Sequence, residues 1–168
     1  LKPESALRQQ AIDIAVISGL PPASDFNCIS LGQDPLLALM HSAHPLTNHA
    51  SILPEMFADF PYVAYHTNPE QGREYDLVFR RHNVLPSNVI SAGVTEAVLT
   101  IVSDSHGLTI LPAWTAESQG PKYGLVTRPI GDGQLTTQWY LAGLHQVANR
   151  EAILQVMQMI QNIVSFNN

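Results

Sequence analysis

The chain is poor in cysteine and has no long apolar run, and both absences narrow the class of protein. Cys28 is its single cysteine, so no disulfide can form within the chain, which favours a reducing compartment. The longest plain aliphatic run, Leu36 to Met40, is too short to cross a bilayer, and no secretory signal pattern is visible. We therefore expect a soluble cytoplasmic protein with no membrane partner.

Basic residues are also scarce. The 168 residues include 8 Lys and Arg against 14 Asp and Glu, which gives a formal net charge of -6. A surface that binds nucleic acid phosphates needs clustered Lys and Arg, and the sequence has no such cluster. We expect that this chain does not bind DNA by itself.

The short motifs of common active sites are missing as well. The sequence has no His-Glu-x-x-His, Cys-x-x-Cys or Gly-x-Ser-x-Gly. His41 and His44 stand three residues apart, but no nearby Cys or acidic residue completes a metal site. Residues 104–106 are Asp-Ser-His, but the members of a real triad meet in space and not in sequence. Residues 131–133, Gly-Asp-Gly, are more typical of a turn than of a nucleotide loop. We expect no catalytic residue, no metal and no cofactor.

What the chain does have is apolar material in short runs. Hydrophobic residues make up 45% of it, which is enough for a buried core. Apolar runs between Gly and Pro predict strands at 12–18, 36–40, 61–65, 89–92, 108–111 and 139–144. Amphipathic patterns predict helices at 74–82, 95–106 and 153–164. This alternation predicts an α/β fold with a largely parallel sheet.

In such folds ligands bind at the carboxyl ends of the strands. Helix N-termini there offer free N–H groups and a positive dipole end to a carboxylate. We expect Thr95 to cap the helix that follows it, and Gly107 to form a left-handed cap at the other end. The candidate positions are the turns Ser18-Gly19, Tyr65-His66-Thr67 and Gly93-Val94-Thr95. Plain turn chemistry or helix capping would explain the turns at Ser18 and Thr95 equally well, and it explains the turn at His66 somewhat better than a ligand does.

Several motifs, taken in order, resemble the effector-binding domain of LysR-type transcription regulators. Leu7 to Ala15 resembles the family's helix-to-strand junction, with Gln10 where the family usually has Gly. Asp34 to Met40 followed by His44-Pro45-Leu46 resembles its strand and His-Pro-Leu loop. Gly107 to Pro112 resembles its Gly, apolar strand and Pro signature. The likeness continues through Val126 to Pro129, Gln138 to Leu144 and the amphipathic end, and so covers most of the chain.

The resemblance implies a two-lobed fold of the periplasmic-binding-protein type with mostly parallel sheets. Residues 1–60 and 127–168 would form lobe I, and residues 61–126 would form lobe II, inserted into it. The family's domain opens with a strand, a helix and a strand that would precede Leu1, and a winged helix-turn-helix comes before them. We expect these N-terminal elements to be missing from this chain.

The resemblance also implies a function that does not involve catalysis. The domain would bind a small acid or an amino acid between its lobes and thereby control DNA binding by the absent winged helix-turn-helix. The resemblance points to the same turns, Ser18-Gly19, Tyr65-His66-Thr67 and Val94-Thr95, and adds Pro112. Residues 112–114, Pro-Ala-Trp, most resemble the regulators of methionine biosynthesis, which sense homocysteine.

The resemblance further implies that the domain forms homodimers or tetramers. Two other classes of function remain open. A transport solute-binding protein shares this fold, although the His-Pro-Leu loop and the amphipathic end argue against it. A bilobal enzyme would need an acid and a base that converge in the cleft, and the sequence does not reveal such a pair.

Overall fold

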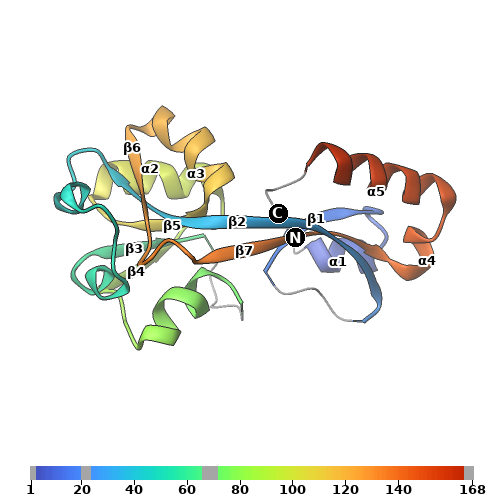
Figure 1. Cartoon of the computed structure of the whole chain (residues 1–168), viewed down its shortest axis with the longest axis horizontal. Helices are drawn as coiled ribbons and strands as arrows, with labels where there is room; N and C mark the ends of the chain where they lie inside the picture. The colour runs from blue at the N-terminus through green and yellow to red at the C-terminus, as the bar shows by residue number, and fades with distance from the viewer. Residues whose placement is uncertain (1–2, 20–23, 66–71, 165–168) are drawn as a thin grey trace. The chain divides into compact units, whose positions relative to one another are not determined.

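The computed structural model describes residues 3–19, 24–65 and 72–164 of the chain (Figure 1). The chain divides into two compact units: unit 1 is Leu1–Asp34 with Gln138–Asn168, and unit 2 is Pro35–Thr137. None of the described helices is long and apolar enough to span a membrane. The elements of unit 1 are α1 (Pro3–Arg8), β1 (Ala15–Ser18), the first half of β2 (Phe26–His41), most of β7 (Thr136–Leu144), α4 (His145–Ala148) and α5 (Glu151–Ile163).

Unit 2 holds the remaining elements, which come from one continuous stretch of chain. They are the second half of β2, η1 (Pro45–Asn48), η2 (Pro54–Asp59), β3 (Pro61–Ala64), η3 (Tyr75–Arg80), β4 (Asn88–Ser91), α2 (Thr95–Ser105), β5 (Thr109–Pro112), α3 (Ala113–Gln119), η4 (Gly120–Tyr123) and β6 (Leu125–Pro129). Of the short helical turns, η3 has π-helical geometry and the other three have 3-10 geometry.

Unit 1 is a small sheet covered by the C-terminal helix. β1 pairs antiparallel with β7, in the register Ala15↔Ala142 to Ser18↔Trp139, and β7 also neighbours β2. The amphipathic pattern of α5 turns Met157 fully inward, with Ile153 and Ile160 partly buried beside it. The predicted helix at 153–164 is confirmed, and its apolar period explains which face packs on the sheet.

The sheet of unit 2 is built around the second half of β2. β5 pairs antiparallel along one edge of β2 from Leu36↔Pro112, and β6 pairs antiparallel with β2 from Leu37↔Pro129. β3 joins at the start of β5, where the Val63 N–H donates to the Leu108 carbonyl over 2.8 Å. β4 then pairs with β3 in parallel.

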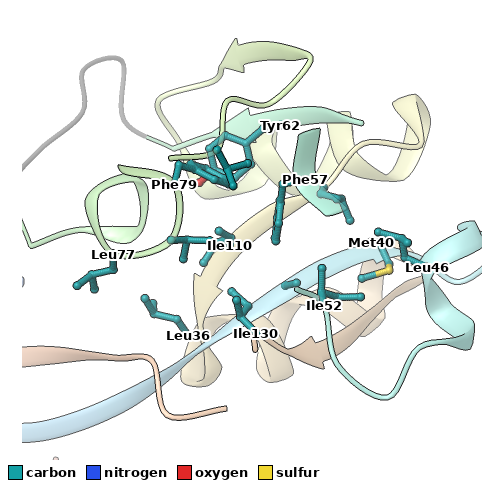
Figure 2. Packing of buried hydrophobic residues seen from close by; sticks show 14 of the residues in the cluster. Leu36, Met40, Leu46, Ile52, Phe57, Tyr62, Leu77, Phe79, Ile110 and Ile130 are labelled. Atoms are coloured by element: carbon teal, nitrogen blue, oxygen red, sulfur yellow. The ribbon is translucent and has the colours of Figure 1, made fainter. Parts of the chain in front are cut away.

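Side chains on both faces of this sheet are buried. Alternate residues of β2, β3 and β5 face two different clusters of buried apolar residues. One cluster includes Met40, Tyr62 and Ile110 and is covered by residues of η2 and η3, among them Phe57 and Phe79 (Figure 2). The other cluster is covered by α2 and α3, whose buried members are Val98, Leu99, Val102 and Ala116. Burial on both faces explains why these strands appear as unbroken apolar runs in the sequence.

The α/β class is confirmed, but the expectation of mostly parallel sheets is wrong for the described ladders. β1–β7, β2–β5 and β2–β6 run antiparallel, and β3–β4 runs parallel. A short apolar run shows only that both faces of a strand are buried. It does not show in which direction its neighbours run.

The compact units do not divide the chain where the expected lobes do. Residues 35–60 and 127–137 were expected in the first lobe and pack within unit 2. The reason lies in β2, whose 16 residues run through both units. Its second half pairs with β5 and β6, so the segments that follow it pack there too.

Candidate functional site

The carboxyl ends of three strands of unit 2 lie at one edge of its sheet. β3 and β4 are parallel up to Ala64↔Ser91, and Tyr62 forms a parallel bridge with Leu108 just before β5. β3 therefore lies between β4 and β5, with neighbouring strands about 4.8 Å apart. We call this the β3–β5 edge. Of the candidate residues, Tyr65 follows β3 directly, Val94 and Thr95 stand at the start of α2 after β4, and Pro112 ends β5.

The N-terminus of α2 lies at this edge, one residue away from where the sequence placed it. Val94 is the N-cap residue, with φ -139 and ψ 145, and Thr95 is the first residue of the helix. The prediction that Thr95 caps α2 is therefore wrong, because the chain stays extended through Val94, whose carbonyl accepts the Val98 N–H at 3.1 Å. Valine has no side-chain acceptor, so no side chain caps α2 in the described part of the chain.

An uncapped start leaves the first N–H groups of α2 without an intrahelical partner. Thr95 is half-buried there, and Val94 is 56% exposed. Glu96 is exposed in the first turn, where its charge suits the helix dipole. Gly93 supplies the turn with φ +79, and a Cβ at Gly93 would meet no atom within 4 Å. The turn thus needs glycine for its backbone conformation, and space remains beside it.

A second helix, α3, starts at the same edge. Pro112 ends β5, is half-buried and is the N-cap residue of α3, again with no side-chain cap. Trp114 follows in the first turn with 59% of its surface exposed. This helix could not be predicted from the sequence, because its seven residues are too few to show a period. The available signal was Pro112 directly after a predicted strand.

Tyr65 lies between the two helix starts. It is half-buried and packs against the apolar cluster beneath α2, and Ala92 donates its N–H to the Ala64 carbonyl beside it at 3.0 Å. The ring is thus supported by the sheet and by the helix. His66 and Thr67, the other two residues of the predicted turn, lie outside the described residues.

The remaining predicted positions, Ser18 and Gly19, belong to unit 1. Ser18 is half-buried at the end of β1, opposite Trp139. Gly19 is buried with φ +99, and its N–H donates to the Gln138 carbonyl over 2.9 Å. The Gly19 N–H is therefore engaged within the sheet of unit 1.

The left-handed residue at the C-terminal end of α2 also stands one position before the residue that the sequence predicted. His106 takes the left-handed conformation with φ 53, and Gly107 does not. Glycine is needed at 107 for a different reason, since a Cβ there would lie 2.8 Å from the Pro61 carbonyl oxygen. No group of three or more His, Cys, Asp or Glu side chains that could hold a metal occurs in the part of the chain that the structure describes.

Comparison with known proteins finds a family model that covers most of the chain. The family model described as LysR substrate binding domain matches residues 2–164. The transcriptional regulator MetR of Salmonella typhimurium is 27% identical over 135 residues, which is 78% of this chain and 41% of MetR. The chain thus spans about two fifths of the length of that relative.

Solved structures show the same fold. The regulatory domain of MetR from N. meningitidis superposes with a TM-score of 0.77 at 21% identity, over 96% of this chain and 75% of that one. The effector-binding domain of QuiR, solved in complex with shikimate, superposes with a TM-score of 0.78 at 20% identity, over 96% of this chain and 76% of that one.

Proposed function

The chain belongs to the LysR substrate-binding-domain family, and from this premise we propose that it is the effector-sensing domain of a bacterial transcription regulator. The resemblance of its motifs to that family is thereby confirmed. MetR of Salmonella typhimurium is a transcriptional regulator. This likeness favours a sensing domain over a transport solute-binding protein or a bilobal enzyme. DNA binding would belong to a winged helix-turn-helix in another part of the regulator, and the working protein would be a cytoplasmic homodimer or tetramer.

The observation that carries the proposal is the uncapped start of α2 at the β3–β5 edge. Val94 offers no side-chain acceptor, so a bound carboxylate would be the acceptor for the first N–H groups of the helix. The hydrogen bonds would be charge-assisted, and the helix dipole would favour the negative charge. Tyr65, Thr95 and Pro112 stand at the same edge, each at or after the end of one of its strands.

The effector class that fits this site is a small carboxylic acid or amino acid. QuiR was solved with shikimate, which carries a carboxylate. The likeness to MetR makes homocysteine the first compound to test. Binding would shift the population between two arrangements of the domain, in proportion to the effector's difference in affinity for them.

The test removes one donor N–H and leaves the helix intact. Proline is tolerated at the first helical position, and Val94 is already extended as a residue before proline must be. We expect Thr95→Pro to weaken binding of the effector about tenfold or more, as the loss of one charge-assisted hydrogen bond does. Isothermal titration with a panel of small acids and amino acids, homocysteine first, measures this on the whole chain.

Glu151→Pro is the matched control. It makes the same change at the first residue of α5, behind the extended N-cap Arg150, and leaves the β3–β5 edge untouched. Its effector affinity should equal that of the unaltered chain. Equal affinities in all three proteins would show that the N–H groups of α2 do not hold the effector. No binding by any acid in the panel would contradict the proposed effector class.

A further inference from the structure

Two histidines at the end of β2 act as hydrogen-bond acceptors for the turn that follows them. His41 Nδ1 accepts the N–H of Ala43 at 3.1 Å, and His44 Nδ1 accepts the N–H of Leu46 at 3.2 Å. In each pair the donor stands two residues further along the chain. A neutral imidazole has one acceptor nitrogen, and an imidazolium has none. The bond from the Leu46 N–H therefore requires a neutral His44 ring.

His44 is buried deeply, with 1% of its surface exposed. Its ring packs on Phe60 with the ring centroids 4.5 Å apart, and Nε2 has no hydrogen-bond partner. The His44 carbonyl also binds Thr47, three residues further along, because it accepts both the N–H and the hydroxyl of Thr47. Burial lowers the pKa of the His44 imidazole, the His106 backbone opposes this shift, and the charge of His106 adds to it.

The charged groups around His44 do not favour a second positive charge there. The His106 ring at the end of α2 meets the His41 ring edge-on, 5.8 Å away. On β6, Arg128 donates to the carbonyls of Thr47 and His49, so a fixed positive charge lies against the same turn. Asp59 and Asp104, on the elements packed nearby, are both exposed, and neither is among the groups that shift the pKa of His44.

We propose that His41–Asn48 is an acid-sensitive latch, which holds its place in unit 2 while His44 is neutral and opens when His44 is protonated. Protonation of His44 removes its Nδ1 acceptor for the Leu46 N–H and places a second positive charge in the turn that Arg128 holds. Opening would withdraw Leu46, which is 8% exposed and packs in the same apolar cluster as Met40 and Ile52 (Figure 2). The packing of unit 2 would then depend on pH.

The direction of this dependence follows from linkage. The open turn takes up a proton on His44 at its ordinary pKa, and the closed turn takes it up only at a lower pH. The ratio of closed to open turn is therefore highest above pH about 6.5. It falls as the pH drops below that value, until the pKa of His44 in the closed state is reached. One histidine changes the ratio of closed to open by at most about tenfold per pH unit in this window.

Amide hydrogen exchange of the whole chain between pH 7.5 and pH 5 tests the latch. After correction for intrinsic exchange, we expect the protection of the Leu46 and Thr47 N–H groups to fall by up to about tenfold per pH unit below pH 6.5. The Val63 N–H, which bonds to the Leu108 carbonyl in the same unit, should keep its protection. His44→Asn should abolish the pH dependence at Leu46, because an Asn side chain accepts the same bond and does not titrate.

His49→Asn is the control, since His49 is exposed and its side chain lies outside both acceptor bonds. It should retain the pH dependence of the unaltered chain. Should His44→Asn fail to fold, His44→Ser serves in its place and should likewise abolish the pH dependence at Leu46, because a Ser hydroxyl accepts the same kind of bond and does not titrate. Protection at Leu46 that stays level to pH 5 in the unaltered chain would overturn the proposal. So would a fall of the same size at Val63, because that would report unfolding of the whole unit.

Discussion

At the scale of single residues, Gly107 shows how close packing, and not a special backbone angle, can require glycine. A Cβ at this position would lie 2.8 Å from the Pro61 carbonyl oxygen and 3.1 Å from the Ser105 hydroxyl. The Pro61 oxygen cannot move aside easily, because it accepts the Leu108 N–H that ties β3 to β5. The left-handed conformation expected at Gly107 is taken by His106.

We therefore expect Gly107→Ala to lower the free energy of unfolding by about 1–3 kcal/mol, as overpacking against backbone does. Gly120→Ala is the matched control, since Gly120 also has a negative φ, and its Cβ would meet the flexible end of Leu39 at 3.3 Å. That control should change stability by about 0.5 kcal/mol or less, with a gain in chain entropy offsetting the contact. Urea denaturation of both variants measures the difference. Equal losses would show that the Pro61 contact is easily relieved.

Thr95 is the second residue whose role the structure changes. Because Val94 is the N-cap residue, Thr95→Ala removes no capping bond. Its effect on the free energy of unfolding should be about 0.5 kcal/mol or less, instead of the roughly 1 kcal/mol that a lost cap costs. A separate effect on effector affinity would identify the hydroxyl as a ligand contact. Thr95→Ser should then keep the affinity and Thr95→Val should lose it, both measured by titration calorimetry.

At the scale of helices and strands, the sequence predicted best where one face of an element is buried. The apolar period of the helix predicted at 153–164 puts Val156, Met157 and Ile163 on one face, and the structure buries Met157 fully but leaves Val156 42% and Ile163 79% exposed. The first half of β2 was missed, because Asn27, Ser30 and Gln33 interrupt any apolar run there. The directions of the strands were wrong because burial on both faces does not determine them.

For the candidate site, the sequence predicted at which strand ends it should lie, but not which residue caps the helix there. The ends of the predicted strands at residues 65, 92 and 111 led to the β3–β5 edge, since carboxyl ends of parallel strands meet at one edge. The helix cap was wrong by one residue, because Thr95 satisfies the capping preference and Val94 does not. The backbone angles of Val94, which capping preferences alone do not predict, make Val94 and not Thr95 the N-cap residue.

Helix α5 allows a direct test of its buried face. Met157→Ala removes a fully buried side chain that packs with Leu31, Leu141 and Ala148. We expect the free energy of unfolding to fall by about 2–5 kcal/mol. Met159→Ala, two residues along the same helix, removes a side chain that is 61% exposed and should cost about 0.5 kcal/mol or less. Chemical denaturation followed by circular dichroism compares them, and similar losses would mean that α5 packs by another face.

At the scale of the whole molecule, the charge of the chain argues against DNA binding by this chain alone. The chain has 8 Lys and Arg against 14 Asp and Glu. Several of those cations are engaged within the fold. Arg8 pairs with Asp25 at 3.0 Å, Arg80 pairs with Asp76 at 3.1 Å, and Arg128 donates to the backbone carbonyls of Thr47, Thr127 and His49.

Because non-specific DNA binding depends on cations that replace the counterions of the phosphates, we expect none from this chain. Fluorescence anisotropy with duplex DNA at pH 7.5, where the formal charge is -6, should show no binding at protein concentrations up to about 10 µM, even at low salt. A longer polypeptide that carries the proposed winged helix-turn-helix should bind under the same conditions, and should lose affinity steeply as salt is added. Salt-sensitive binding by this chain alone would place a DNA contact in the sensing domain. That result would contradict the proposal that DNA binding belongs to another part of the regulator. The titrations with small acids would still test the effector site independently.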